Sequence, residues 1–225
     1  MVLLNGFQTG RQSAGIDYYQ YWAIVEAARS MDVGNFYSRE ESVRIGGELL
    51  RRANETEGAV RFQAVAEYRQ VLDNNQSPFL YVALSPLISG DYEADFRFYR
   101  HLTLLLTTGS ILLLAVLAGL VPIEAVGVLC LVLAGLESLN SDIRVGNVGQ
   151  LQLAAVTLYA WIQSRSPSTL RDVLGGVVLG LAVLFKPTIA VVVAVLGISW
   201  LVVGDWRKCR DQAIGAVLAG ALAGI

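Results

Sequence analysis

The sequence contains few charged residues, few cysteines and a single histidine, and each shortage argues against a class of protein. Charged residues make up 16% of the 225 residues, whereas a soluble domain has about a quarter. Two cysteines cannot form a disulfide framework, and with His101 as the only histidine there is no Cys/His cluster for structural zinc. The net charge of -2 argues against nucleic acid as a partner, since neutralising phosphates requires clustered Lys and Arg.

The charged residues that are present are unevenly distributed along the chain. Residues 1–101 hold 23 of the 36 Asp, Glu, Lys and Arg, and residues 102–225 hold only 13. The second part lacks the polar helix faces that a soluble protein with a large apolar core would need. Together with a mean hydropathy of +0.52, this distribution predicts a membrane protein.

Apolar runs in the second part approach the length of a membrane span, which needs about 20 mostly apolar residues. The predicted spans are 102–121, 123–139, 148–162, the longer segment 173–203, and a partial span at 213–225. Pro122 and Glu124 mark a tight turn between the first two spans, and residues 140–147 form a polar connection. Because the final run stops while it is still apolar, we expect the sequence to be a partial chain.

The segment 173–203 is too long for one straight span, and Lys186-Pro187 stands near its middle. Proline removes a backbone donor and disfavours helix at the preceding residue, so a single kinked span and a hairpin of two short helices are both open. Basic residues stand in the loops before and after the segment, namely Arg165, Arg171, Arg207, Lys208 and Arg210. The positive-inside tendency favours the hairpin, which puts both loops in the cytoplasm and Lys186 at the outer surface.

This orientation places residues 1–101 outside the membrane as an extracytoplasmic helical loop region. Ser38 and Glu41 form a capping box that opens one helix, and a second helix is predicted over about 56–73. Residues 78–87 are apolar but too short to span, which is typical of an interfacial or re-entrant segment. The predicted fold class is therefore all-α, a polytopic helical protein with several spans in the plasma (inner) membrane.

The first candidate site is an acid within an aromatic cluster. Asp17 is followed by Tyr18, Tyr21 and Trp22, whose rings with polar tips suit the faces of sugar rings. A carboxylate in such a place can act as a general base toward a hydroxyl group. The alternative is an aromatic belt at the membrane interface with Asp17 capping a helix.

Two other features are a lysine within an apolar run and a short run of acidic residues. Lys186 interrupts an apolar run, where its ammonium either faces a phosphate or anchors the hairpin at the interface by snorkelling. The acidic run 91–95 offers paired carboxylates for a divalent cation, although a solvated acidic loop is favoured. We therefore expect no cofactor and assign no metal site, with a divalent cation as the alternative.

The last feature is the polar strip at residues 142–150. Asn147 and Gln150 offer amide donors at the start of a predicted helix, where an anion is favoured. The alternative is a simple turn in which Asp142 pairs with Arg144.

In their order along the chain, these features resemble the polytopic GT-C glycosyltransferases, and most closely glycosyltransferase family 87, which uses polyprenyl-phosphate sugars. The matching segments are Asp17…Tyr21…Ala23 with Gly34 and Tyr37, Ser77-Pro78-Phe79-Leu80, Ser85-Pro86-Leu87, Gly146-Asn147-Val148-Gly149-Gln150, and Gly180-Leu181-Ala182 leading to Lys186-Pro187. The resemblance covers about residues 13–203 and lies in the order and spacing of short motifs.

The resemblance implies transfer of a mannose-like hexose from a polyprenyl-phosphate carrier to the hydroxyl of a glycan or lipid acceptor, at the extracytoplasmic face and with inversion. It implies that Asp17 is the general base and that Lys186 stabilises the departing phosphate. Arg144, Asn147 and Gln150 would position sugar or phosphate. Two alternatives are a transporter or flippase for lipid-linked saccharide, and a non-enzymatic assembly subunit of the membrane.

Overall fold

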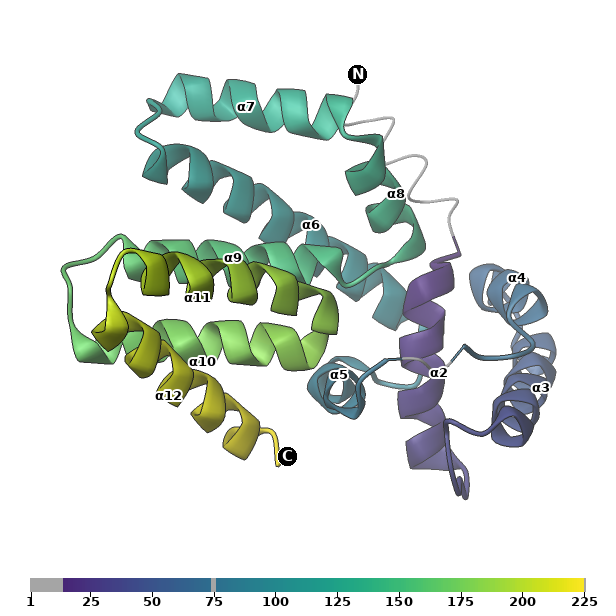
Figure 1. Ribbon diagram of the computed structural model, residues 1–225. Helices are drawn as coiled ribbons and strands as arrows, with labels where there is room; N and C mark the ends of the chain where they lie inside the picture. The colour runs from purple at the N-terminus through teal and green to yellow at the C-terminus, as the bar shows by residue number, and fades with distance from the viewer. Residues whose placement is uncertain (1–13, 74–75, 225) are drawn as a thin grey trace. The chain divides into compact units, whose positions relative to one another are not determined.

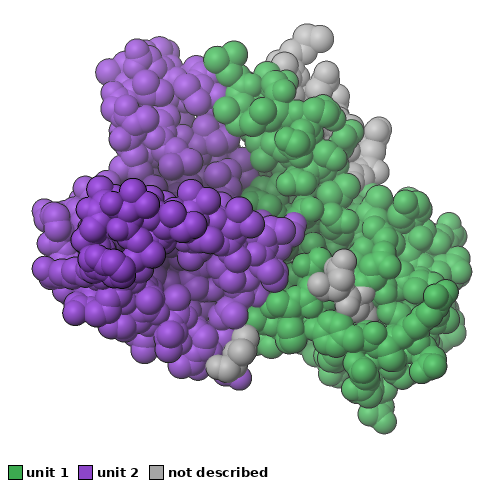
Figure 2. Space-filling model, in the orientation of Figure 1, with its two compact units in different colours: residues 1–105, 131–150 green, residues 106–130, 151–225 purple. Residues whose placement is uncertain are grey.

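The computed structural model describes residues 14–73 and 76–224, and the residues it describes are all-α. They form eleven α-helices and two short 3-10 helices, with no strand among them. The chain divides into two compact units, which are considered separately (Figure 2). Unit 1 comprises residues 1–105 and 131–150, and unit 2 comprises residues 106–130 and 151–225.

Unit 1 is built around one buried helix, α2. Its helices are α2 (Ile16–Ser30), α3 (Arg39–Glu55), α4 (Val60–Tyr68), α5 (Pro78–Leu84), η1 (Ser85–Leu87), the first part of α6 (Tyr92–Leu117), the last part of α7 (Pro122–Gly135) and α8 (Glu137–Val145) (Figure 1). Every residue of α2 from Tyr18 to Ala27 is buried. The helix is therefore enclosed by its neighbours rather than amphipathic.

Aromatic rings fill the space between α2, α4 and α6. Tyr18 stacks on Tyr99 with ring centroids 4.5 Å apart, and Trp22 meets Phe62 and Tyr92 edge-on at 5.2 Å. Buried aromatic pairs in such geometries stabilise a fold beyond their buried area alone. These rings are the hydrophobic core of unit 1.

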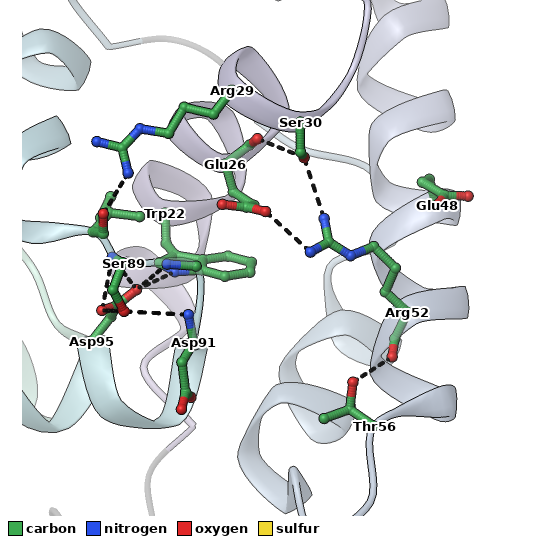
Figure 3. Close-up of polar contacts among 12 residues, drawn as sticks. Trp22, Glu26, Arg29, Ser30, Glu48, Arg52, Thr56, Ser89, Asp91 and Asp95 are labelled. Atoms are coloured by element: carbon green, nitrogen blue, oxygen red, sulfur yellow. Dashed lines mark hydrogen bonds and ion pairs between the residues drawn. The ribbon is translucent and has the colours of Figure 1, made fainter.

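Hydrogen bonds and an ion pair hold α2 to the helices on either side. The Asp95 carboxylate accepts hydrogen bonds from Trp22 Nε1 (2.9 Å) and from the backbone and hydroxyl of Ser89 (Figure 3). On the other side, Arg52 Nη2 of α3 lies 3.0 Å from the buried Glu26 carboxylate. Both acids are buried with partners, as a buried charge requires.

Local signals explain where two of these helices begin and end. Ser38 Oγ accepts the backbone N–H of Glu41 at 3.2 Å, so the predicted cap of α3 is confirmed. The predicted helix over about 56–73 is shorter than expected, because Gly58 adopts a left-handed φ of 77° before α4 and the helix ends at Tyr68.

Unit 2 contains the second part of α6, most of α7, α9 (Gly149–Gln163) from Leu151 onward, α10 (Thr169–Phe185), η2 (Pro187–Ile189), α11 (Ala190–Val202) and α12 (Trp206–Leu222). Helices α10 and α12 pack closely through glycines. A Cβ on Gly176 would stand 2.1 Å from the carbonyl oxygen of Gln212, and one on Gly215 would stand 2.1 Å from that of Val173. Small residues that let two backbones approach are typical of helix pairs in membranes.

The chain breaks its helix at Lys186, as Pro187 predicts. Helix α10 ends at Phe185, and Lys186 is extended, with φ of -152°. The chain then turns through η2 and returns along α11 (Figure 1). The longest predicted apolar segment is thus two helices in this structure.

Several helix boundaries differ from those expected. Residues 140–147, expected to be a polar connection, lie mostly within α8, whose end is set by Gly146 in a left-handed conformation (φ 74°). Helix α6 begins at Tyr92, ten residues before the predicted span, and α12 begins at Trp206 rather than near 213.

Among the described residues, one helix is long and apolar enough to cross a membrane, namely α6. A second is counted if α7 and α8, which are bent by 72° at their junction, form one broken span. The apolar helices over Pro78–Leu87 and Pro187–Val202 are shorter. The arrangement of several spans therefore stays a prediction.

Candidate functional site

Asp17 stands in the first turn of α2, where a carboxylate is favoured by the helix dipole. The N-cap position is held by Gly15, which adopts a left-handed φ of 72° and whose missing Cβ leaves room for the Phe96 ring. Asp17 is therefore not the N-cap itself. Its side chain is 29% exposed.

The amide of Asn147 meets the Asp17 carboxylate, although 130 residues separate the two in sequence. Asn147 Nδ2 donates to Asp17 Oδ2 at 3.2 Å. The backbone around Asn147 is held in turn, because Tyr99 Oη donates to its carbonyl at 3.1 Å. Two segments singled out separately in the sequence are thus brought together in unit 1.

The sharp turn before Asn147 makes this meeting possible. Gly146 has φ of 74°, and a Cβ there would stand 2.6 Å from Cβ of Tyr18. Gln150, which is 1% exposed, lies directly behind this turn. In the amide orientation that satisfies both of its ends, Gln150 donates to the carbonyl of Asn147 (2.5 Å) and accepts from the N–H of Ile143 (3.3 Å). Gln150 therefore supports Asn147 from behind, and its role in positioning sugar or phosphate stays a prediction.

A basic residue that the sequence did not single out completes the surroundings of Asp17. Arg69 Nη2 lies 3.9 Å from Asp17 Oδ1, and Arg69 Nη1 donates to Asp73 Oδ2 at 2.8 Å. Arg69 follows α4 directly, and nothing in its local sequence indicates that it faces α2. The Asp17 carboxylate thus has an amide near one oxygen and a guanidinium near the other.

A second carboxylate, Asp142 of α8, lies in the same neighbourhood. Its Oδ2 stands 2.7 Å from the point where a Cβ of Gly149 would be. Burial, followed by the nearby negative charges of Asp17 and Asp142, raises the pKa of Tyr21 well above its ordinary value. Both carboxylates therefore lie close enough to Tyr21 to affect its phenol.

The three aromatic residues expected to form a sugar platform are all buried. Tyr18, Tyr21 and Trp22 are 1%, 4% and 1% exposed. The Tyr18 ring is stacked on Tyr99, and the Trp22 indole donates to Asp95. Their rings pack in the core of unit 1, so their role as a platform stays a prediction that this packing does not favour.

The remaining predicted residues lie elsewhere. Arg144 is on the exposed side of α8 and pairs with Glu137 at 3.0 Å. Lys186 belongs to unit 2, is half-buried, and occupies the corner between α10 and η2. Its carbonyl accepts from Nε2 of Gln152 at 3.4 Å, which connects the corner to α9.

The acidic run 91–95 is not the solvated loop that the sequence favoured. Asp91 Oδ1 accepts the N–H of Ala94 (3.1 Å) at the start of α6, and Glu93 pairs with Arg61 at 2.7 Å. Asp95 is buried, and four donors converge on its carboxylate. In the part of the chain that the structure describes, no group of three or more His, Cys, Asp or Glu side chains is placed to hold a metal ion.

Comparison with protein-family models, with curated proteins and with solved structures finds no match. The candidate site is therefore defined by its own geometry, centred on Asp17, Asn147 and Arg69 in unit 1.

Proposed function

We propose that this chain belongs to a membrane glycosyltransferase that moves a hexose from a polyprenyl-phosphate carrier to an acceptor hydroxyl at the extracytoplasmic face. The observation that carries the proposal is the hydrogen bond between Asn147 Nδ2 and Asp17 Oδ2. It joins the acid and the amide to which the family resemblance assigns roles in sugar transfer, in a site where the acid keeps partial access to solvent.

Sugar transfer by general-base catalysis requires a carboxylate that is ionised and held in a fixed orientation. In the proposed step, the acceptor oxygen bonds to the anomeric carbon, its proton passes to the Asp17 carboxylate, and the bond from that carbon to the phosphate oxygen breaks, leaving the electron pair on the phosphate. Asn147 and Arg69 fix the carboxylate while the proton is transferred. General-base catalysis of this kind contributes about 10²–10⁴-fold to the rate.

The departing phosphate requires a positive partner, and Lys186 is proposed for that role. A cation aimed at the developing charge lowers the barrier most where water is excluded. Lys186 stands at a helix break between two apolar helices, and the extended backbone there is held by α9 through Gln152.

Membrane location is supported by helix α11. None of its residues is buried. Large apolar side chains are exposed along its whole length, namely Val191, Val192, Val195, Ile198, Leu201 and Val202. An apolar helix with no polar face and no fully buried residue is favoured by lipid over water.

A transfer assay tests the proposal. Membranes containing the protein are supplied with a radiolabelled polyprenyl-phosphate hexose, and the product is followed over time. Asp17→Asn keeps the shape and an acceptor for Asn147 but removes the base, so transfer should fall by at least about 100-fold. Glu55→Gln removes an exposed carboxylate of α3 and should leave the rate unchanged. Transfer by Asp17→Asn at the unsubstituted rate overturns the assignment.

Interrupted helices favour a second candidate, a transporter of lipid-linked saccharide. The break at Lys186 and the 72° bend between α7 and α8 are such interruptions. A transporter moves intact lipid-linked sugar across the membrane of a proteoliposome without forming a new glycosidic bond. Product analysis in the transfer assay therefore distinguishes a transporter from a glycosyltransferase.

A further inference from the structure

One end of unit 2 gathers basic side chains from two loops. The cations are Arg165 and Arg171 around the start of α10, and Arg207, Lys208 and Arg210 in the first turns of α12. We call this set the basic end of unit 2. The α9–α10 connection and the α11–α12 corner lie on the same side of the unit (Figure 1).

Hydrogen bonds join the two loops into one surface. Arg207 Nη2 donates to Thr169 Oγ1 at 2.8 Å, which links α12 to the first residue of α10. Arg171 Nη1 donates to the carbonyl of Arg165 at 2.9 Å, which closes the loop before α10. The close glycine packing of α10 on α12 fixes this arrangement from beneath.

The acids at this end are already engaged. Asp172 and Asp211 are buried, and each is held by the arginine that precedes it, at 2.7 Å in both cases. Asp205 accepts the backbone N–H of Lys208 as the cap of α12. Five cations face three acids here, so the surface is positive. Arg165, Arg207 and Arg210 are exposed to solvent and Lys208 is half-buried, while Arg207 Nε also lies 3.8 Å from Asp211 Oδ2.

Tryptophans accompany these cations. The Arg165 guanidinium lies 4.7 Å from the centre of the Trp161 ring, and the Lys208 ammonium lies 5.7 Å from that of Trp200. With the exposed Trp206, three of the four tryptophans of the chain stand at the basic end. Tryptophan beside Arg and Lys at the ends of apolar helices is typical of the level of lipid headgroups.

We propose that the basic end of unit 2 binds the phosphate headgroups of anionic phospholipids in the cytoplasmic leaflet. Charge complementarity selects anionic over zwitterionic lipid, and the exposed Leu170, Val202 and Val203 next to the cations provide contact for acyl chains, which free phosphate does not need. The inference rests on the membrane location in the proposed function, and it is independent of sugar transfer.

The test measures retention of lipid by the delipidated full chain in detergent, using native mass spectrometry. Phosphatidylglycerol should bind at least tenfold more tightly than phosphatidylcholine, and inorganic phosphate at the same concentration should neither bind nor compete. Arg165→Gln with Lys208→Gln should weaken phosphatidylglycerol binding about 25-fold, since each basic residue near an anionic headgroup contributes about fivefold. These two substitutions do not change Arg171 and Arg210, which pair with Asp172 and Asp211.

A matched control removes the same charge from unit 1. Arg44→Gln with Arg51→Gln changes two exposed arginines of α3 and should not alter lipid retention. Equal binding of the two phospholipids, or unchanged phosphatidylglycerol binding by the Arg165/Lys208 variant, overturns the proposal. If inorganic phosphate displaces the lipid, the basic end is a simple phosphate site, and this result also overturns the proposal. None of these results bears on sugar transfer, which the assay with Asp17→Asn tests separately.

Discussion

The indole of Trp22 donates to the carboxylate of Asp95 at 2.9 Å, joining α2 to α6 across 73 residues of sequence. The same carboxylate also accepts from the backbone of Ser89 and of Gly90 and from the Ser89 hydroxyl. One buried acid thus fixes the central helix of unit 1, the loop before α6 and the start of α6 itself.

Replacing that acid should weaken unit 1. In Asp95→Asn only one oxygen can accept, and the new amide N–H₂ faces the donors of Trp22 or Ser89. Losing charge-assisted bonds and leaving buried donors unpaired should lower the free energy of unfolding by about 2–4 kcal/mol. Denaturant unfolding followed by tryptophan fluorescence measures this. Asp91→Asn, at an exposed helix cap, should cost about 1 kcal/mol or less, and equal losses in the two variants would contradict the role given to Asp95.

The packing of α10 on α12 should tolerate no side chain at Gly176. Its Cβ would stand 2.1 Å from a backbone oxygen, so Gly176→Ala must separate the helices. We expect a large fall in the thermal unfolding midpoint. Gly197→Ala on α11 is the matched control, since nothing lies within 4 Å of its Cβ position and alanine favours helix by about 1 kcal/mol. A Gly176→Ala protein as stable as the Gly197→Ala protein would show that the close packing is not present.

The turn at Gly146 should control the approach of Asn147 to Asp17. Gly146→Ala adds left-handed strain of about 1–2 kcal/mol and a Cβ 2.6 Å from Tyr18. Gly58→Ala adds the same kind of strain, with φ of 77°, but meets no atom within 4 Å. We therefore expect Gly146→Ala to lower sugar transfer well below the rate of Gly58→Ala. Similar rates for the two variants would show that sugar transfer does not depend on the geometry of this turn.

Alkaline pH should unfold unit 1 through its buried tyrosines. Burial raises the pKa values of Tyr18 and Tyr19 far above the ordinary value of 10.0, and raises that of Tyr81 to about 12. A folded-state pKa above the unfolded value means that the neutral phenol favours the fold, so this contribution is complete below pH 10 and is lost as pH rises above it. Absorbance at the tyrosinate band, recorded with circular dichroism, should show these phenols ionising together with loss of helix. Their ionisation near pH 10 with helix intact would contradict the burial.

The corner at Lys186 should be accessible from outside the cell. With Cys130 and Cys209 replaced by serine, Lys186→Cys should react with an impermeant thiol reagent added to intact cells, whereas Arg207→Cys should react only after the membrane is opened. The reverse pattern would mean that α10 and α11 do not form a hairpin open to the outside.

The features that could be predicted from sequence are those set by a few neighbouring residues. The cap at Ser38 and the helix break before Pro187 depend on hydroxyl and proline chemistry within one turn. Helix α8 was missed because its Asn, Ser and Asp residues have low helix propensity. Gly146 was the available signal, since a left-handed glycine commonly ends a helix.

The candidate site could be predicted only in part. Asp17 and Asn147 were singled out for separate reasons, but no local pattern indicated that they touch. Arg69 and Asp142 were not assigned to the site, because their positions depend on how α4 and α8 pack against α2. Asp95 was expected in a solvated loop, since its burial depends on donors from Trp22 and Ser89 that only the folded chain brings together.

The distance in sequence between Asp17 and Asn147 also sets an order of events during synthesis. Asp17 is made early, but its amide partner leaves the ribosome only after 130 further residues, and α6 and α7 are made in between. At typical elongation rates of about 5–20 residues per second, the carboxylate therefore exists for several seconds or more without its partner. The nascent chain therefore cannot form the Asp17–Asn147 hydrogen bond until α6, α7 and α8 have been synthesised.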